Sequence, residues 1–198
     1  MTLYIFTLVA FLLPLAYSPG PGNLFFAALG ARFGIAATLP ANAGYHIATF
    51  VLTLLGGAGL VSTLDPHSPL FSALKTAGAL YVLWIAWKMA QAGPAEKVVD
   101  QKSAGFFDGV SLLILNPKAY LIIVLMFSQF GASGPEDLRD RILLISVVFT
   151  VNNFLAFSLW TLAGDGLGRL FRSETAAARL NRGFALVLAG VAVWILLG

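Results

Sequence analysis

The stretch "YSPGPGN" (residues 17–23) breaks a segment that otherwise has the composition of a membrane helix. No Asp, Glu, Lys or Arg occurs from Met1 to Ala31, so this stretch falls where the bilayer midplane is expected. A proline inside a helix costs about 3 kcal/mol and a glycine about 1 kcal/mol relative to alanine. Broken backbone at that depth is tolerated only inside protein or beside a water-filled cavity. The stretch therefore predicts a broken membrane helix that neighbouring helices enclose.

The composition of the whole chain agrees with a membrane protein. Of its 198 residues, 59% are hydrophobic and 11% are charged, whereas soluble domains average about 45–50% and about 25%. The net charge of +3 is spread over the expected loops, which does not fit a nucleic-acid-binding patch. With no cysteine and two histidines, thiolate and multi-histidine metal sites are excluded, and we expect no cofactor and no metal. We also expect no cleaved signal peptide, because hydrophobicity resumes at Leu24.

Hydrophobic runs separated by charged or turn-forming residues predict six membrane spans. The predicted spans are Leu3–Leu29, Ala36–Val61, Leu70–Met89, Phe106–Phe130, Ile142–Ala163 and Leu180–Leu197. The predicted connections fall at residues 65–69, 93–94, 131–135 and 164–168, which are rich in Gly and Pro. We expect a single membrane domain with a first three-helix repeat at 1–92, a cytoplasmic linker at 93–104 and a second three-helix repeat at 105–198.

Positive charge in the short loops predicts the orientation. Eight Lys or Arg residues fall on one side of the membrane: Arg32, Lys88, Lys97, Lys102, Arg169, Arg172, Arg179 and Arg182. Three fall on the other: Lys75, Arg139 and Arg141. The side with eight is predicted to be cytoplasmic. The loop at 88–104 is then cytoplasmic and both termini lie outside.

The two halves of the sequence resemble each other. Ser18-Pro19 has a counterpart in Asn116-Pro117, and Asn42 in span two has a counterpart in Asn152 in span five. Because each half has three spans, the halves must have opposite topologies, as in the inverted repeats of many secondary transporters. The predicted fold is an all-α integral membrane protein with six transmembrane helices in a 3+3 inverted repeat. Spans one and four are broken near the midplane.

Both breaks carry the signals of a helix start. Ser and Asn are favoured N-caps, and Pro is favoured at the first helical position. In the first break, Gly20-Pro21 offers a competing start two residues after Ser18-Pro19. Helix N-termini attract anions, so the breaks predict a substrate-binding site; the simpler alternative is a pair of proline kinks without a ligand. The predicted binding residues are Ser18, Pro19, Gly20, Pro21, Gly22, Asn23, Asn42, Asn116, Pro117, Lys118 and Asn152.

Lys118 is the one charged residue between Gly109 and Pro135 and lies near the middle of span four. A charge at the bilayer centre costs about 2.5–3.5 kcal/mol on insertion scales, and a cation at a helix N-terminus opposes the helix dipole. Lys118 therefore needs an anionic partner or must lose its proton. No acidic residue falls near mid-span, so we expect the partner to be the carboxylate of the substrate. The alternative is a structural lysine held by backbone carbonyls.

His46 lies one helical turn after Asn42 and can titrate near neutral pH, so it is a candidate proton relay together with Lys118. A neutral histidine bonded to a neighbouring helix is the alternative. An intramembrane hydrolase is disfavoured, because no carboxylate pair, thiol or histidine cluster occurs at membrane depth. A Ser18–His46 or Ser18–Lys118 dyad is the remaining arrangement that such an enzyme could use.

Three stretches carry a resemblance to a known family. "SPGPGN" (18–23), "ALKTAGALYVLWIAWK" (73–88) and "FFDGVSLLILNPKAYLIIVLMFSQF" (106–130) resemble the LysE/RhtB family of amino-acid exporters, over essentially the whole chain. The chain departs from the family pattern at Gly22, where larger residues often occur, and this glycine is expected to loosen the first break.

The resemblance implies a non-enzymatic secondary exporter of an amino acid or close derivative in the bacterial inner membrane. It also implies coupling to protons, contact with membrane lipid and no nucleic-acid partner, while a homodimer stays open. The lack of an acidic residue in span two favours a neutral amino acid. The alternatives are an exporter of another small solute or cation, and a membrane scaffold that transports nothing.

Overall fold

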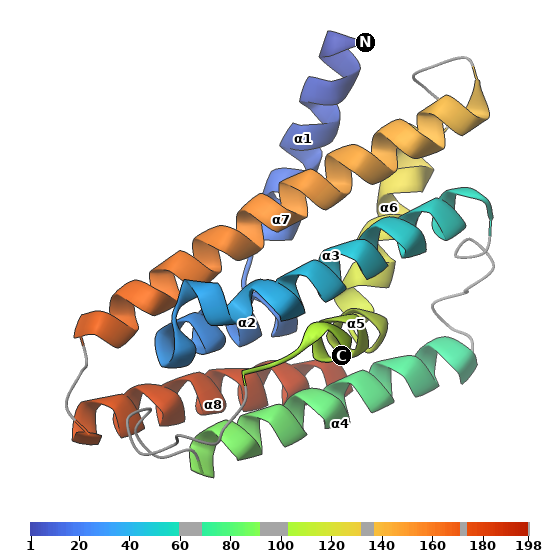
Figure 1. The fold of residues 1–198 in the computed structure, drawn as a ribbon. Helices are drawn as coiled ribbons and strands as arrows, with labels where there is room; N and C mark the ends of the chain where they lie inside the picture. The colour runs from blue at the N-terminus through green and yellow to red at the C-terminus, as the bar shows by residue number, and fades with distance from the viewer. Residues whose placement is uncertain (60–68, 92–102, 132–136, 171–173, 198) are drawn as a thin grey trace.

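The computed structural model describes all residues except 60–68, 92–102, 132–136, 171–173 and 198, and the described residues form helices without strands (Figure 1). The eight helices are α1 (Thr2–Tyr17), α2 (Pro21–Phe33), α3 (Ile35–Gly57), α4 (Pro69–Gln91), α5 (Phe106–Ile114), α6 (Pro117–Phe130), α7 (Leu138–Leu170) and α8 (Glu174–Leu197). Within the described ranges, α7 is long and apolar enough to cross a membrane, and so is each of two bent pairs, α1–α2 and α5–α6. The secondary structure of the described ranges is therefore all-helical, as predicted.

The first bend, of 64°, lies between α1 and α2 at the quoted stretch. Ser18 ends α1 in an extended conformation, and Gly20 is the N-cap of α2 with Pro21 at its start. The predicted break is confirmed, but the start of its second helix at Pro19 is wrong, and the competing start at Pro21 is correct. Gly20 has extended dihedrals and no side-chain cap, so the fixed φ of Pro21 is the local signal that starts α2.

The second bend, of 63°, lies between α5 and α6. Asn116 is the N-cap of α6: its side-chain oxygen accepts a hydrogen bond from the backbone N–H of Lys118 at 3.2 Å. Pro117 occupies the first helical position, where its missing N–H costs nothing. The prediction for this break is confirmed residue by residue.

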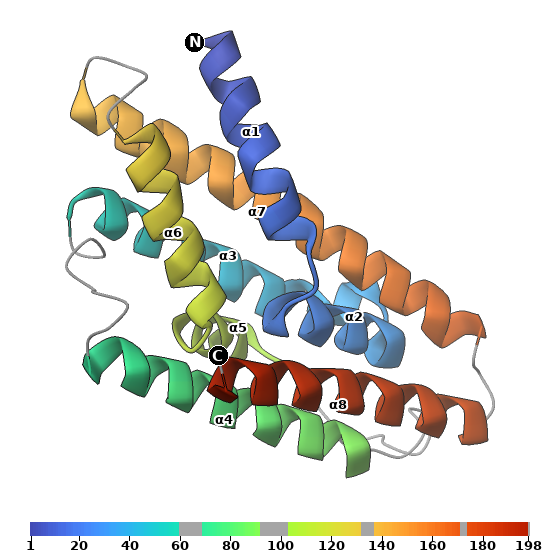
Figure 2. The ribbon, with the colours of Figure 1, turned by 180° about the vertical axis from the view of Figure 1, so that it is seen from behind.

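The helices form layers in which α4 and α8 lie side by side, with α2, α3 and α5 between this pair and α7 (Figures 1 and 2). Helix α1 of the first bent pair meets α6 of the second, and the two run in opposite directions (Figures 1 and 2). The hydroxyl of Tyr4 in α1 donates to the backbone oxygen of Phe130 in α6 at 3.0 Å, and the two rings pack edge to face. At the opposite end, α2 packs against α7 and α5 packs against α3.

Glycines bring these last two helix pairs into backbone contact. A methyl group at Gly164 of α7 would overlap the carbonyl oxygen of Ala27 in α2, and one at Gly109 of α5 would overlap that of Ala41 in α3. The prediction that residues 164–168 form a connection is therefore wrong, because α7 continues to Leu170. Small residues allow close helix approach in membrane proteins, and these glycines serve that packing instead of ending the helix.

Large apolar side chains cover the outer faces of the bundle. Phe6 of α1, Leu125 of α6 and Leu155 of α7 are exposed, as expected for side chains that face lipid. The predicted connection at 93–94 lies outside the described residues, as do most of those at 65–69 and 131–135 and most of the predicted linker at 93–104. Pro69, the last residue of the first of these, begins α4.

Candidate functional site

Lys118 joins the two breaks. Its ammonium nitrogen donates hydrogen bonds to the backbone oxygen of Ser18 at 2.9 Å and to the Ser18 hydroxyl at 3.0 Å. The Ser18 hydroxyl in turn donates to the backbone oxygen of Leu15 at 3.2 Å. Of the two serine dyads considered from the sequence, the structure forms the Ser18–Lys118 contact, and there the lysine acts as a donor to both oxygens.

Tyr45 of α3 is hydrogen-bonded to the second break. The amide nitrogen of Asn116 donates to the hydroxyl of Tyr45 at 3.0 Å, while the amide oxygen of Asn116 caps α6. Both residues are buried. The N-terminus of α6 is therefore held by a side chain of the first half of the chain, and sequence reasoning did not find this residue.

The first break is fixed by Asn23 and by close packing at its glycines. Asn23 is buried, and its amide nitrogen donates to the backbone oxygen of Ala16 at 2.9 Å, which ties the start of α2 to the end of α1. A methyl group at Gly22 would lie 2.7 Å from the ring of Phe157, and one at Gly20 would lie 3.0 Å from the side chain of Lys118. The expectation that Gly22 loosens this break is wrong: the missing side chain allows tight packing.

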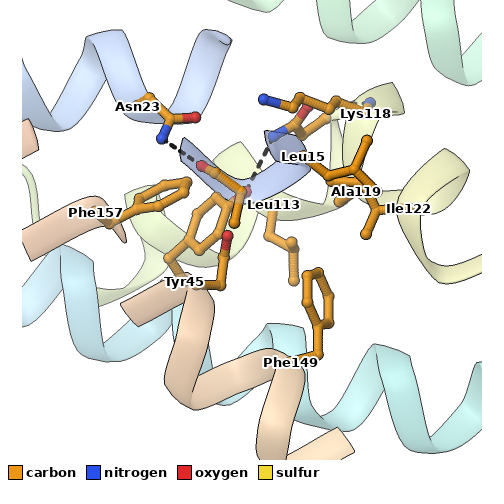
Figure 3. A pocket seen from close by; sticks show the side chains of 12 residues that line it. Leu15, Asn23, Tyr45, Leu113, Lys118, Ala119, Ile122, Phe149 and Phe157 are labelled. Atoms are coloured by element: carbon orange, nitrogen blue, oxygen red, sulfur yellow. Dashed lines mark hydrogen bonds between the residues drawn. The ribbon is translucent and has the colours of Figure 1, made fainter. Parts of the chain in front are cut away.

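These residues line a pocket between the two breaks and α7 (Figure 3). The lining comprises Leu15, Ala16, Asn23, Tyr45, Leu113, Asn116, Lys118, Ala119, Ile122, Phe149, Asn153 and Phe157. Among these described lining residues Lys118 carries the only charge, and most of the others are apolar. The lining therefore suits a ligand with one anionic group and an apolar body. The enclosed space is only about 10 Å³, room for about one water molecule, so such a ligand requires the surrounding helices to move apart.

Other predicted site residues do not line this pocket. Pro19, Pro21 and Pro117 set the backbone of the breaks, whereas Asn42, His46 and Asn152 lie elsewhere in α3 and α7. His46 Nδ1 is 2.8 Å from the backbone oxygen of Asn42, one turn earlier in the same helix. Asn42 Oδ1, His46 Nε2 and Asn152 Nδ2 are buried without a hydrogen-bond partner among the described residues.

From the sequence, Asn153 of α7 is one of several amides that could line a polar cavity, and it lines the pocket. Sequence reasoning missed the aromatic walls, Phe149 and Phe157, which lie four residues before and after it and so share its helix face. That spacing was the available signal, but a single apolar helix does not reveal which of its faces meets a pocket. Within the described part of the chain no three His, Cys, Asp or Glu residues lie together to hold a metal ion.

The family model "LysE type translocator" matches residues 13–198. The chain belongs to this family. Its members are transporters, not enzymes, and efflux proteins of the family are bacterial inner-membrane proteins with apolar helices.

Relatives with described functions cover nearly the whole chain. This LysE type translocator is 28% identical over 181 residues to the leucine efflux protein of Klebsiella pneumoniae subsp. pneumoniae, which covers 88% of this chain and 85% of the relative. It is 29% identical over 182 residues to the cysteine/O-acetylserine efflux protein of Salmonella paratyphi A, which covers 91% of each chain. No solved structure matches the chain significantly.

Proposed function

We propose that this translocator exports neutral amino acids or close derivatives, with the substrate carboxylate bound between the two breaks. The observation that carries the proposal is the Lys118 ammonium, which links the start of α6 to Ser18 at the edge of an otherwise uncharged pocket. The start of α2 has no side-chain cap and can offer backbone N–H groups to an anion, whereas the Lys118 N–H at the start of α6 is already capped by Asn116. The positive dipole ends of both helices favour an anion. A bound carboxylate replaces Ser18 as the partner of Lys118.

The preference for a neutral substrate follows from the pocket lining. Among its described residues there is no Asp or Glu to pair with a cationic side chain, and Lys118 repels one. Leu15, Ile122 and Phe149 provide apolar surface for the body of the substrate. The relatives named for leucine and for cysteine/O-acetylserine efflux fit this substrate class. Export of another small solute or a cation is the alternative function.

We further propose that the chain spans the membrane six times as a 3+3 inverted repeat. In this arrangement α1–α2, α3 and α4 form the first repeat, and α5–α6, α7 and α8 form the second. The nearly equal bends of 64° and 63° support the correspondence. The helices α3, α4 and α8 have 23, 23 and 24 residues, and a helix of that length extends about 35 Å, enough to cross a bilayer.

The proposed orientation has both termini outside and the loop at 88–104 in the cytoplasm. Arg32 and Arg169 lie at the end of the bundle where α2 packs against α7. Arg141 lies at the other end, where its guanidinium donates to the backbone oxygen of Gly131 after α6. The positive-inside rule then places the first end, which carries more positive charge, in the cytoplasm.

Proton coupling is part of the proposal and rests on Lys118 and His46. When a substrate carboxylate replaces Ser18 beside Lys118, the negative charge favours the protonated form of the lysine. When the substrate leaves, that stabilisation is lost, so the protonation of Lys118 can change during the cycle. The His46 ring, which lies against the backbone of Asn42 and of Asn153, can accept a proton. The unpaired amide oxygen of Asn42 and the unpaired amide nitrogen of Asn152 are polar groups that a moving water can meet. Outward-facing apolar side chains contact membrane lipid.

A counterflow screen of the twenty amino acids in proteoliposomes, with and without an imposed pH gradient, tests this function. We expect flux of neutral amino acids above that of lysine and arginine, and a pH gradient is expected to drive accumulation. Folded protein that transports none of the twenty would refute amino-acid export. Flux that ignores the pH gradient would refute proton coupling alone.

A further inference from the structure

Asn153 differs from the other polar side chains of the pocket in its hydrogen bonding. Lys118, Asn116, Asn23 and Tyr45 each take part in at least one hydrogen bond within the protein. The side-chain amide of Asn153 has no such partner among the described residues, although the residue is only 5% exposed and lines the pocket.

The side-chain atoms of Asn153 are not among the fully buried atoms that lack a partner, so its amide stays open to the pocket, where water or a ligand can pair with it. The pocket lining brings Asn153 next to the space that the proposed substrate would fill. Asn42 and Asn152 each have one fully buried amide atom without a partner among the described residues, but neither residue lines the pocket. Asn153 is therefore the amide placed to meet the substrate.

The neighbours of Asn153 indicate which group of the substrate it meets. Phe149 and Phe157 lie one turn before and one turn after it on α7, and both line the pocket. The amide oxygen of Asn153 can accept N–H hydrogen bonds from a cation, and aromatic rings that line the same pocket attract positive charge. The described lining offers no carboxylate for the α-ammonium group of an amino acid, so this group must use neutral acceptors.

We propose that Asn153, together with the rings of Phe149 and Phe157, forms the subsite for the substrate α-ammonium group. This assignment rests on the proposed amino-acid export. It divides recognition between two places: Lys118 and the helix N-termini select the carboxylate, and Asn153 selects the amine. A carboxylic acid without the α-amine then pairs with Lys118 but leaves Asn153 without a partner, so it binds more weakly than the amino acid.

Competition against labelled leucine in counterflow tests the subsite. Unlabelled leucine is compared with 4-methylpentanoate, which has the same carbon skeleton without the amine. In the unmodified protein we expect the amine-free acid to compete about tenfold or more weakly than leucine. In Asn153→Leu the two ligands are expected to compete to within about threefold of each other. The variant weakens competition by leucine and leaves competition by the amine-free acid nearly unchanged.

Asn153→Asp is the second variant and is nearly isosteric with the original residue. A carboxylate at this position attracts the ammonium of leucine and repels the net charge of 4-methylpentanoate, so the preference for leucine is expected to increase. Thr161→Val is the matched control on the same helix. Thr161 is buried, and within the described residues its hydroxyl donates to the backbone oxygen of Phe157 and the residue lies outside the pocket lining. It is expected to keep the original preference.

Each result decides between the assignments. Measurable flux with an unchanged leucine preference in Asn153→Leu, or a decreased preference in Asn153→Asp, would overturn the ammonium subsite. A change confined to the ratio of leucine to O-acetylserine would also overturn it, because Asn153 would then contact the substrate side chain. If Asn153→Leu fails to fold, Asn153→Asp alone decides. If the unmodified protein transports no amino acid, that result would instead refute both the proposed function and the subsite.

Discussion

Lys118 donates two hydrogen bonds to Ser18, a residue 100 positions earlier in the chain, at 2.9 and 3.0 Å. Ser18 ends α1 and Lys118 lies in the first turn of α6, so one side chain connects the two broken helices. Because this cation would otherwise meet the positive ends of helix dipoles, its two oxygen partners compensate an unfavourable position. A carboxylate is a stronger partner than either oxygen.

The first prediction concerns the charge of Lys118. Lys118→Ala removes a charged hydrogen-bond donor worth about 1.5–3 kcal/mol, so we expect substrate affinity to fall about 10- to 150-fold. Lys118→Arg keeps the charge with a different geometry and is expected to retain more transport than Lys118→Ala. Counterflow in proteoliposomes measures both. Full transport by Lys118→Ala together with none by Lys118→Arg would contradict the carboxylate role.

The second prediction concerns the hydrogen bond from Asn116 to Tyr45. Tyr45→Phe removes this bond, which contributes about 0.5–1.5 kcal/mol, and substrate affinity is expected to fall about two- to tenfold. In a background that already carries Asn116→Ala, the same change is expected to have little further effect, because the two residues act through one contact. Additive losses in this double-mutant cycle would show that Tyr45 acts independently of the second break.

The third prediction concerns the glycines of α7. A methyl group at Gly164 would overlap the backbone of Ala27, whereas nothing lies within 4 Å of one at Gly166. We expect Gly164→Ala to destabilise the protein by about 1–3 kcal/mol. Gly166→Ala, the matched control two residues away, is expected to stabilise the helix by about 0.5–1 kcal/mol. Thermal unfolding in detergent measures both changes, and equal shifts for the two variants would argue against the α2–α7 backbone contact.

The fourth prediction concerns the orientation in the membrane. The chain has no cysteine, so single introduced cysteines report on their own positions. In intact cells, a membrane-impermeant maleimide is expected to label Thr2→Cys and Asp137→Cys but not Lys97→Cys until the cells are permeabilised. The reverse labelling pattern would invert the proposed orientation and leave the fold unchanged. Labelling of Thr2→Cys and Asp137→Cys from opposite sides would contradict the proposed number of spans.

Much of the fold follows from local rules. Proline, glycine and N-cap preferences act within a few residues, and for that reason the break at Asn116-Pro117 was predicted correctly. The hydrophobic runs located the described helices to within a few residues at most ends, since each run must be long enough for a helix. At Gly164 the same local reasoning failed, because glycine favours both a chain break and close helix packing.

The sequence by itself determined that this is an all-helical membrane protein, that two helices are broken by Pro and Gly, and that Lys118 needs a partner. Only the tertiary structure decided that the partner is Ser18, that Tyr45 holds Asn116, and that Asn153 faces the pocket. The physical reason is the distance along the chain over which each interaction acts. Helix starts and stops depend on neighbouring residues, whereas the facing side chains of distant helices depend on how the whole bundle packs.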